Sequence, residues 1–184
     1  MSRIPYPKLE DLSPAKRAFA TTPGMRMLNI IRMAMHTPDG MWEKQRDFSV
    51  SAVGPSLIGP RLREILVLRI GALSNSEYEL HHHRSLARNQ GIDDATIRAV
   101  EKGDFASLGE KESVVAQFTS ELVTNVSPSD QTLALARAHF SDAAIFEMVA
   151  IIGIYMMNAR IIAVGGCELD GQAVESWDKD KITS

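Results

Sequence analysis

The sequence contains one cysteine, few aromatic residues and no long uninterrupted apolar run. Because Cys167 has no second cysteine to pair with, an internal disulfide is excluded, which fits a reducing, cytoplasmic compartment. No run approaches the ~18 consecutive apolar residues of a membrane span, and the first residues lack an apolar signal core. Acidic and basic residues are interspersed at a net charge of −3, so the basic patch of a nucleic-acid-binding protein is missing.

Segments of alternating apolar and polar residues, which indicate strands, are also missing, and the predicted fold class is all-α. A chain of 184 residues with 45% hydrophobic residues can form one domain with a real core. We expect an N-terminal arm and short helix over residues 1–20, a helical domain over 21–171 and a polar tail over 172–184.

Proline and glycine positions divide the chain into short helices. Pro5 and Pro7 predict an extended N-terminal arm that either wraps a neighbouring subunit or is mobile, and the tail from Gly171 is expected to fray. Apart from a central pair of helices, helical spacing and capping residues predict helices at about 14–20, 24–35, 41–53, 93–102, 110–124, 129–139 and 143–164.

The stretch from Arg61 to Gly91 predicts a helical hairpin. Its first arm runs from about Pro60 to Leu73 and is apolar on every side, which is typical of a helix in the middle of a bundle. Glu64 is the acid in this apolar arm, so its carboxylate needs a partner. Arg61, one turn earlier, is the expected partner, and a purely structural ion pair is one reading of the two residues.

The second arm of the hairpin follows the cap-rich break at residues 74–76 and ends before Gly91. A helical wheel at roughly 100° per residue places His83 near the centre of the apolar arc, with Glu79 one turn earlier on the same side. His81 and His82 point away, toward solvent or a subunit contact. Consecutive histidines on a helix diverge and cannot bind one ion together, so no metal site is predicted.

Glu64, Glu79 and His83 are therefore the candidate catalytic residues. A carboxylate beside an imidazole raises the imidazole pKa and fixes its tautomer, and such a pair suits general acid–base chemistry near neutral pH. An inward-facing histidine with a structural role is the alternative interpretation.

At these residues the sequence resembles the carboxymuconolactone decarboxylase and alkylhydroperoxidase D superfamily. The resemblance rests on Glu64, on the run Tyr78-Glu79-Leu80-x-x-His83-x-x-x-Ala87-x-x-x-Gly91, on residues 91–97 and on residues 153–160. It covers most of the chain from Met25 to Gly171. The resemblance implies an alkylhydroperoxidase D-like helical bundle, assembled into a homo-oligomer (a dimer, trimer or hexamer), with active sites near subunit interfaces and no cofactor.

The peroxidase branch of this superfamily carries a Cys-x-x-Cys pair, which would fall at Ser76 and Glu79. Both cysteines are replaced, so peroxide reduction through a dithiol is excluded. The proton-relay glutamate of that branch falls on Glu64 and its terminal histidine on His83, while its other relay histidine falls on Tyr78. The relay is thus partly kept and the redox centre is lost.

The decarboxylase branch carries a glutamate and a histidine at the positions of Glu79 and His83. We therefore expect a cofactor-free lyase that acts on a small carboxylated lactone or a related aromatic-catabolism intermediate, with substrate contacts expected from Tyr78, Arg61, Arg63 and Arg160. A peroxidase-like proton-relay enzyme without the dithiol and a non-catalytic oligomeric binding protein are the alternatives. In the binding protein, side chains would fill the space beside His83.

Overall fold

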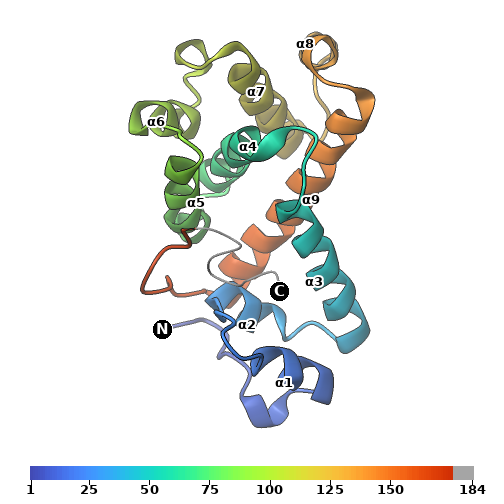
Figure 1. The fold of residues 1–184 in the computed structure, drawn as a ribbon, viewed down its shortest axis with the longest axis vertical. Helices are drawn as coiled ribbons and strands as arrows, with labels where there is room; N and C mark the ends of the chain where they lie inside the picture. The colour runs from blue at the N-terminus through green and yellow to red at the C-terminus, as the bar shows by residue number, and fades with distance from the viewer. Residues whose placement is uncertain (176–184) are drawn as a thin grey trace.

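The computed structural model describes residues 1–175, and all the regular structure in that range is helical, which confirms the all-α prediction (Figure 1). The helices are η1 (Leu9–Asp11), α1 (Pro14–Ala20), α2 (Asn29–Ala34), α3 (Asp39–Val53), α4 (Gly59–Leu73), α5 (Glu77–Asn89), α6 (Asp94–Lys102), η2 (Phe105–Ser107), α7 (Glu110–Asn125), α8 (Asp130–His139) and α9 (Asp142–Gly165).

Helix α4 forms the centre of the bundle. It packs against α5, α6, α7 and α9, and its residues from Ile65 to Leu68 are essentially inaccessible to solvent. This burial on every side is what an all-round apolar helix predicts. Ser76 caps the following helix α5 by accepting a hydrogen bond from the backbone N–H of Glu79, and Gly91, with a φ of 73°, turns the chain after it.

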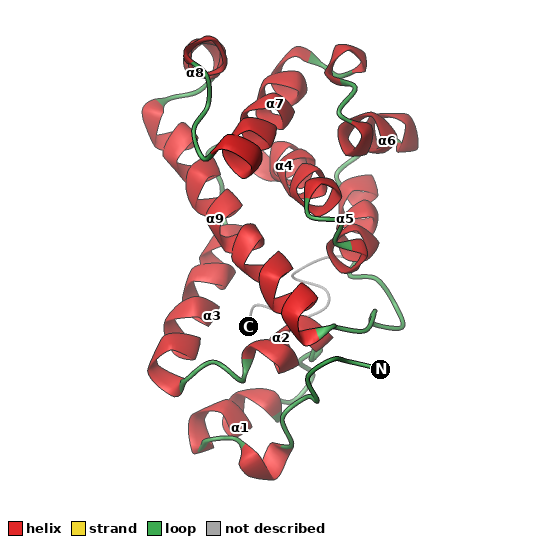
Figure 2. Cartoon of the chain, turned by 180° about the vertical axis from the view of Figure 1, so that it is seen from behind, coloured by secondary structure: helices red, strands yellow, loops and turns green. Residues whose placement is uncertain are grey.

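Helix α9 is the longest helix and runs along the molecule from α8 to α2 (Figure 2). Helix α9 is long and apolar enough to cross a membrane, but the buried core helix of a soluble protein can have the same length and composition. Its inner side packs on α4, α7, α3 and α2, and 44% of its most apolar window is buried in the bundle. Its outer side leaves Phe146 and Val164 exposed.

Helix α2 is shorter than the predicted helix at residues 24–35. Gly24 adopts a left-handed φ of 77°, and the helix begins only at Asn29. Its first N–H groups are capped from elsewhere in the chain: that of Asn29 donates to Asp170 Oδ1 at 3.0 Å, and that of Ile30 donates to the Tyr78 hydroxyl at 3.1 Å. Such long-range caps have no local sequence signal.

Both ends of the described range, residues 1–175, pack on the rest of the chain. The backbone N–H groups of Arg3 and Ile4 donate to the carbonyl of Gly165 at 2.8 and 3.0 Å, so the N-terminal arm lies against the end of α9 rather than reaching away from the chain. The expectation of a frayed tail from Gly171 is wrong as far as the structure describes it. Val174 is fully buried, and Arg26 donates to the carbonyl of Ala173 at 3.2 Å. The remaining tail residues, 176–184, lie outside the described range.

Candidate active site

The helical hairpin α4–α5 brings the three predicted acid–base residues together. Close packing of its two helices is possible because Gly71 has no side chain: a Cβ there would lie 3.0 Å from Leu80 Cδ2 and 3.5 Å from Glu79 Cβ. This contact sets Glu64 on α4 against the face of α5 that carries Glu79 and His83.

His83 lies between two carboxylates. Its Nδ1 is 2.7 Å from Glu64 Oε2, and its Nε2 is 3.6 Å from Glu79 Oε2. Since an ionised carboxylate can only accept, the Nδ1–H donates to Glu64 and Nε2 faces Glu79. The exposed fractions of Glu64, Glu79 and His83 are 2%, 6% and 1%, so the array is shielded from bulk water. The edge of the Tyr155 ring packs on the imidazole at 5.2 Å between centroids.

Burial and neighbouring charges shift the pKa values of Glu79 and His83 in opposite directions. Burial raises the pKa of Glu79 to about 7, and the nearby His83 only partly offsets that rise. Burial lowers the pKa of His83, but the charge of Glu64, its hydrogen bond and the charge of Glu79 together leave that pKa above its ordinary value. The pKa of Glu79 therefore lies near neutral pH, the range in which general acids and bases work best, while that of His83 lies above its ordinary value.

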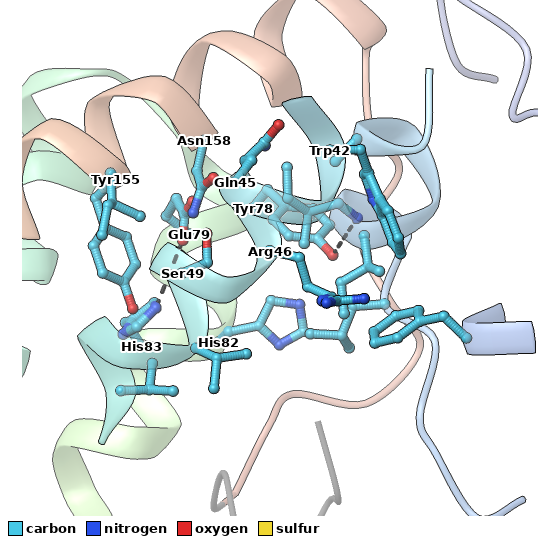
Figure 3. A pocket seen from close by; sticks show the side chains of 18 residues that line it. Trp42, Gln45, Arg46, Ser49, Tyr78, Glu79, His82, His83, Tyr155 and Asn158 are labelled. Atoms are coloured by element: carbon cyan, nitrogen blue, oxygen red, sulfur yellow. Dashed lines mark hydrogen bonds and ion pairs between the residues drawn. The ribbon is translucent and has the colours of Figure 1, made fainter. Parts of the chain in front are cut away.

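Glu79 and His83 line a cavity of about 140 Å³ (Figure 3). Its wall is mostly apolar, with contributions from α1, α2, α3, α5 and α9. The polar side chains that line it, apart from the acid–base pair, are Gln45, Arg46, Ser49, Tyr78, His82 and Asn158. The filled pocket expected of a non-catalytic protein is therefore not observed.

The arginines predicted from sequence lie elsewhere. Arg61 is not the partner of Glu64, as the sequence suggested; it pairs with Glu112 at 2.7 Å and donates to the carbonyl of Gly91, because its long side chain reaches across to α7. Arg63 is buried, donates to the carbonyl of Gly54 at 2.9 Å and has its Nε 3.9 Å from Glu64 Oε1.

Arg160 is exposed and folds back onto the carbonyl of Met156, one turn earlier. None of the three arginines lines the cavity beside His83.

Tyr78 and His82 form a second buried network. The prediction that His82 faces solvent is wrong: its exposed fraction is 3%, because residues 166–175 fold over α5. The Tyr78 hydroxyl donates to Asp170, His82 Nε2 lies 3.1 Å from the same carboxylate, and the backbone N–H of Val174 donates to His82 Nδ1 at 3.0 Å. Burial lowers the pKa of His82, so its neutral form, with the proton on Nε2, fits these partners.

The adjacent His81 is partly exposed, although its Nε2 is buried and has no hydrogen-bond partner. Among residues 1–175, no group of three or more His, Cys, Asp and Glu side chains is arranged to hold a metal ion.

Sequence reasoning missed Arg46, Ser49, Asn158 and Asp170 at the site. Arg46 and Ser49 lie on α3 one turn apart, and Asn158 was noted only as a polar exception within α9. Asp170 follows the last helix. None has a local motif. The packing of α3 and α9 around α5 brings the first three to the cavity, and the C-terminal segment brings Asp170 to His82.

Two comparisons with known proteins match this structure. The sequence model of the Carboxymuconolactone decarboxylase family matches residues 44–121, which contain Glu64, Glu79 and His83. The crystal structure described as "alkylhydroperoxidase AhpD core: uncharacterized peroxidase-related protein", from Ralstonia eutropha JMP134, is similar with a TM-score of 0.75 and 17% sequence identity, over 92% of this chain and 93% of its own. No curated protein matches the sequence. The predicted superfamily resemblance and the alkylhydroperoxidase D-like bundle are confirmed.

Proposed function

Since residues 44–121 match the sequence model of the Carboxymuconolactone decarboxylase family, we propose that the protein is a cofactor-free enzyme that decarboxylates a small carboxylated lactone or a related ring-cleavage product. The observation that carries the proposal is the buried array Glu64–His83–Glu79, which opens into a cavity at Glu79 and His83. A pKa of about 7 lets Glu79 give and take a proton at neutral pH.

The proposed reaction needs one proton per turnover. The bond between a ring carbon and its carboxylate breaks, the electron pair remains on the ring as an enolate, and CO₂ leaves. Protonated Glu79 delivers a proton to the carbon and recovers one from the imidazolium of His83 across their 3.6 Å separation. Glu64 holds the ring of His83 through Nδ1 and stabilises its positive charge. Solvent then restores the proton.

The developing enolate oxygen needs hydrogen-bond donors in a site that excludes water. The amide of Asn158 and the hydroxyl of Ser49 line the same cavity as Glu79 (Figure 3). We assign them to the enolate oxygen, because neutral donors held in place before the reaction stabilise charge without reorganising.

Thiol-dependent peroxide reduction is the second candidate, raised by the peroxidase-related name of the structural neighbour. Ser76 and Glu79 occupy the positions of the expected dithiol. Burial, with the charges of Asp170 and Glu79, raises the pKa of Cys167 to about 11, which disfavours the reactive thiolate. These observations favour acid–base chemistry over thiol chemistry.

Assays of CO₂ release from a panel of carboxylated lactones test the proposal. We expect turnover by the wild type and a fall in kcat of about 10²-fold or more in both Glu79→Gln and His83→Gln, because general acid–base catalysis contributes about 10²–10⁴. His139→Gln, a histidine outside the cavity, serves as the control and should keep the wild-type rate. Full activity of His83→Gln, or peroxide consumption with a thiol reductant in place of CO₂ release, would contradict the proposal.

A further inference from the structure

The cavity has a cationic side chain at the end opposite its acid–base pair. Figure 3 shows Arg46 and Trp42 on one side of the cavity and His83 and Tyr155 on the other. His82, the other basic side chain between them, has its pKa lowered by burial and is neutral at pH 7. Arg46 is therefore the permanent positive charge among the described residues that line the cavity.

Two aromatic rings hold the guanidinium of Arg46 in place. Its central carbon lies 5.1 Å from the centroid of the Trp42 ring and 5.5 Å from that of the Phe19 ring. Contacts of this kind favour the cation and restrict its side-chain rotamers. The planar group is thus held at the cavity with little conformational freedom left to lose when it binds an anion.

The carboxylate that now pairs with Arg46 is exchangeable. Asp47, the next residue, contacts Arg46 Nε at 3.0 Å and Nη2 at 2.6 Å, but the Asp47 side chain is 56% exposed. Exposed ion pairs contribute little free energy. A ligand carboxylate that approaches from the cavity side can therefore displace Asp47 from the guanidinium, whose own side chain is 33% exposed.

The volume of the cavity limits the size of the ligand. An engineered apolar cavity of about 150 Å³ holds one benzene molecule, and this cavity measures about 140 Å³. The apolar wall between its two ends includes Ile31, Val50 and Ile154. One six-membered or five-membered ring fills this space, so the polar groups of the ligand must contact the side chains at the two ends directly.

We propose that Arg46 binds a carboxylate that stays on the ligand throughout the reaction, and that the ligand is a single-ring carboxylate whose opposite, reacting end faces Glu79. This assignment rests on the proposed function for the identity of the reacting end, whereas the carboxylate site itself is independent of catalysis. Arg46 thus takes the role of substrate anchor that the sequence suggested for Arg61, Arg63 or Arg160.

Binding measurements separate the anchor from the chemistry. We expect the wild type to bind benzoate more tightly than benzamide, its uncharged counterpart of the same shape, in isothermal titration calorimetry. Arg46→Gln should weaken benzoate binding about tenfold or more, since a charge-assisted bidentate contact is lost, and should leave benzamide binding unchanged. Arg46→Lys should fall between the two, because a lysine keeps the charge without the planar fork.

Two further variants complete the test. Asp47→Asn removes the competing carboxylate and should tighten benzoate binding by about two- to fivefold. Arg160→Gln, on the exposed side of α9, should bind like the wild type. Equal loss of benzoate and benzamide binding in Arg46→Gln would overturn the proposal, because it would show that Arg46 only supports Trp42 structurally. A loss of benzoate binding confined to Arg160→Gln would also overturn it. If benzoate binding follows these expectations but no carboxylated lactone releases CO₂, the carboxylate site at Arg46 is supported and the proposed reaction is contradicted.

Discussion

Glu64 controls the protonation of His83, because its carboxylate supplies both the nearest negative charge and the 2.7 Å hydrogen bond to Nδ1. We expect Glu64→Gln to lower the pKa of His83, since the amide keeps a hydrogen-bond acceptor and loses the charge. The imidazole pKa can be followed by NMR titration, and the high-pH limb of the activity profile should move to lower pH with it, because the proposed reaction uses the imidazolium. Glu77→Gln, an exposed acid on the same hairpin, should leave the pKa unchanged. An unchanged His83 pKa in Glu64→Gln would mean that Glu64 is not its positioning residue.

The same pair predicts a pH dependence of stability. A folded-state pKa above the unfolded value means that the native protein binds the proton more tightly, so this stabilisation is complete below about pH 6.5 and is lost as pH rises through the folded pKa. Glu64→Gln should therefore reduce the free energy of unfolding by about 1–3 kcal/mol at pH 6 and by less at pH 9. Urea unfolding at the two pH values measures the difference. An equal loss at both would show that the charge of His83 is not involved.

At the scale of elements, the C-terminal segment 166–175 holds the cavity wall together. Asp170 accepts hydrogen bonds from Tyr78, His82 and the N-terminus of α2, so one carboxylate joins three segments that are far apart in sequence. Asp170→Asn should lower the free energy of unfolding by about 1–3 kcal/mol, since the hydrogen bonds to a partly buried charge are weakened. Glu168→Gln, a half-exposed neighbour, is the control. Equal free energies of unfolding for the two variants would contradict the structural role proposed for this segment.

A pair of glycine substitutions tests how closely α4 and α5 must approach. Gly71 and Gly153 both lie inside helices, so replacing either with alanine gains about 1 kcal/mol of helix propensity. A Cβ at position 153 meets no atom within 4 Å, whereas one at position 71 meets Leu80 at 3.0 Å. We expect Gly153→Ala to raise the melting temperature and Gly71→Ala to lower it. For Gly71→Ala the expected net loss in the free energy of unfolding is about 1 kcal/mol. A stabilised Gly71→Ala would show that Leu80 can move aside.

The hairpin could be predicted from the sequence because its signals are local. Gly59-Pro60, the cap at Ser76 and the turn at Gly91 set the helix ends, and the helical period placed Glu79 and His83 on one face. The partner of Arg61 and the burial of His82 could not be predicted in this way. Each depends on residues that only the tertiary structure brings close, and a helical wheel cannot show that a distant segment will cover its polar side.

At the scale of the whole molecule, the cavity lies where two parts of the bundle meet. Helices α4 and α5 supply the acid–base array, while α1, α2 and α3 supply the wall that carries Arg46 and Trp42, and α9 runs along both. The acid–base groups and Arg46 therefore face the same cavity only when the N-terminal helices α2 and α3 pack on α9 beside the hairpin. A small rotation of α3 would change the distance between the two ends of a bound ligand without disturbing Glu79 or His83.

The outer side of α9 carries three exposed apolar side chains, with exposed Arg160 on the same face. Phe146, Val149 and Val164 are exposed by 71%, 39% and 62%, and helical spacing sets all three on one face of α9. Exposed apolar side chains on one helix face are typical of an interaction site, and the homo-oligomer expected from the resemblance would cover them. We expect Phe146→Glu to shift the protein to monomers in sedimentation velocity experiments, because the carboxylate would be buried without a partner.

Met41→Glu, an equally exposed apolar residue on α3, is the matched control and should leave the assembly intact. If Met41→Glu dissociates the assembly and Phe146→Glu does not, the subunits meet through α3, and the cavity mouth at Arg46 would then lie close to that contact. A wild-type protein that sediments as a monomer at every concentration would contradict the expected homo-oligomer itself.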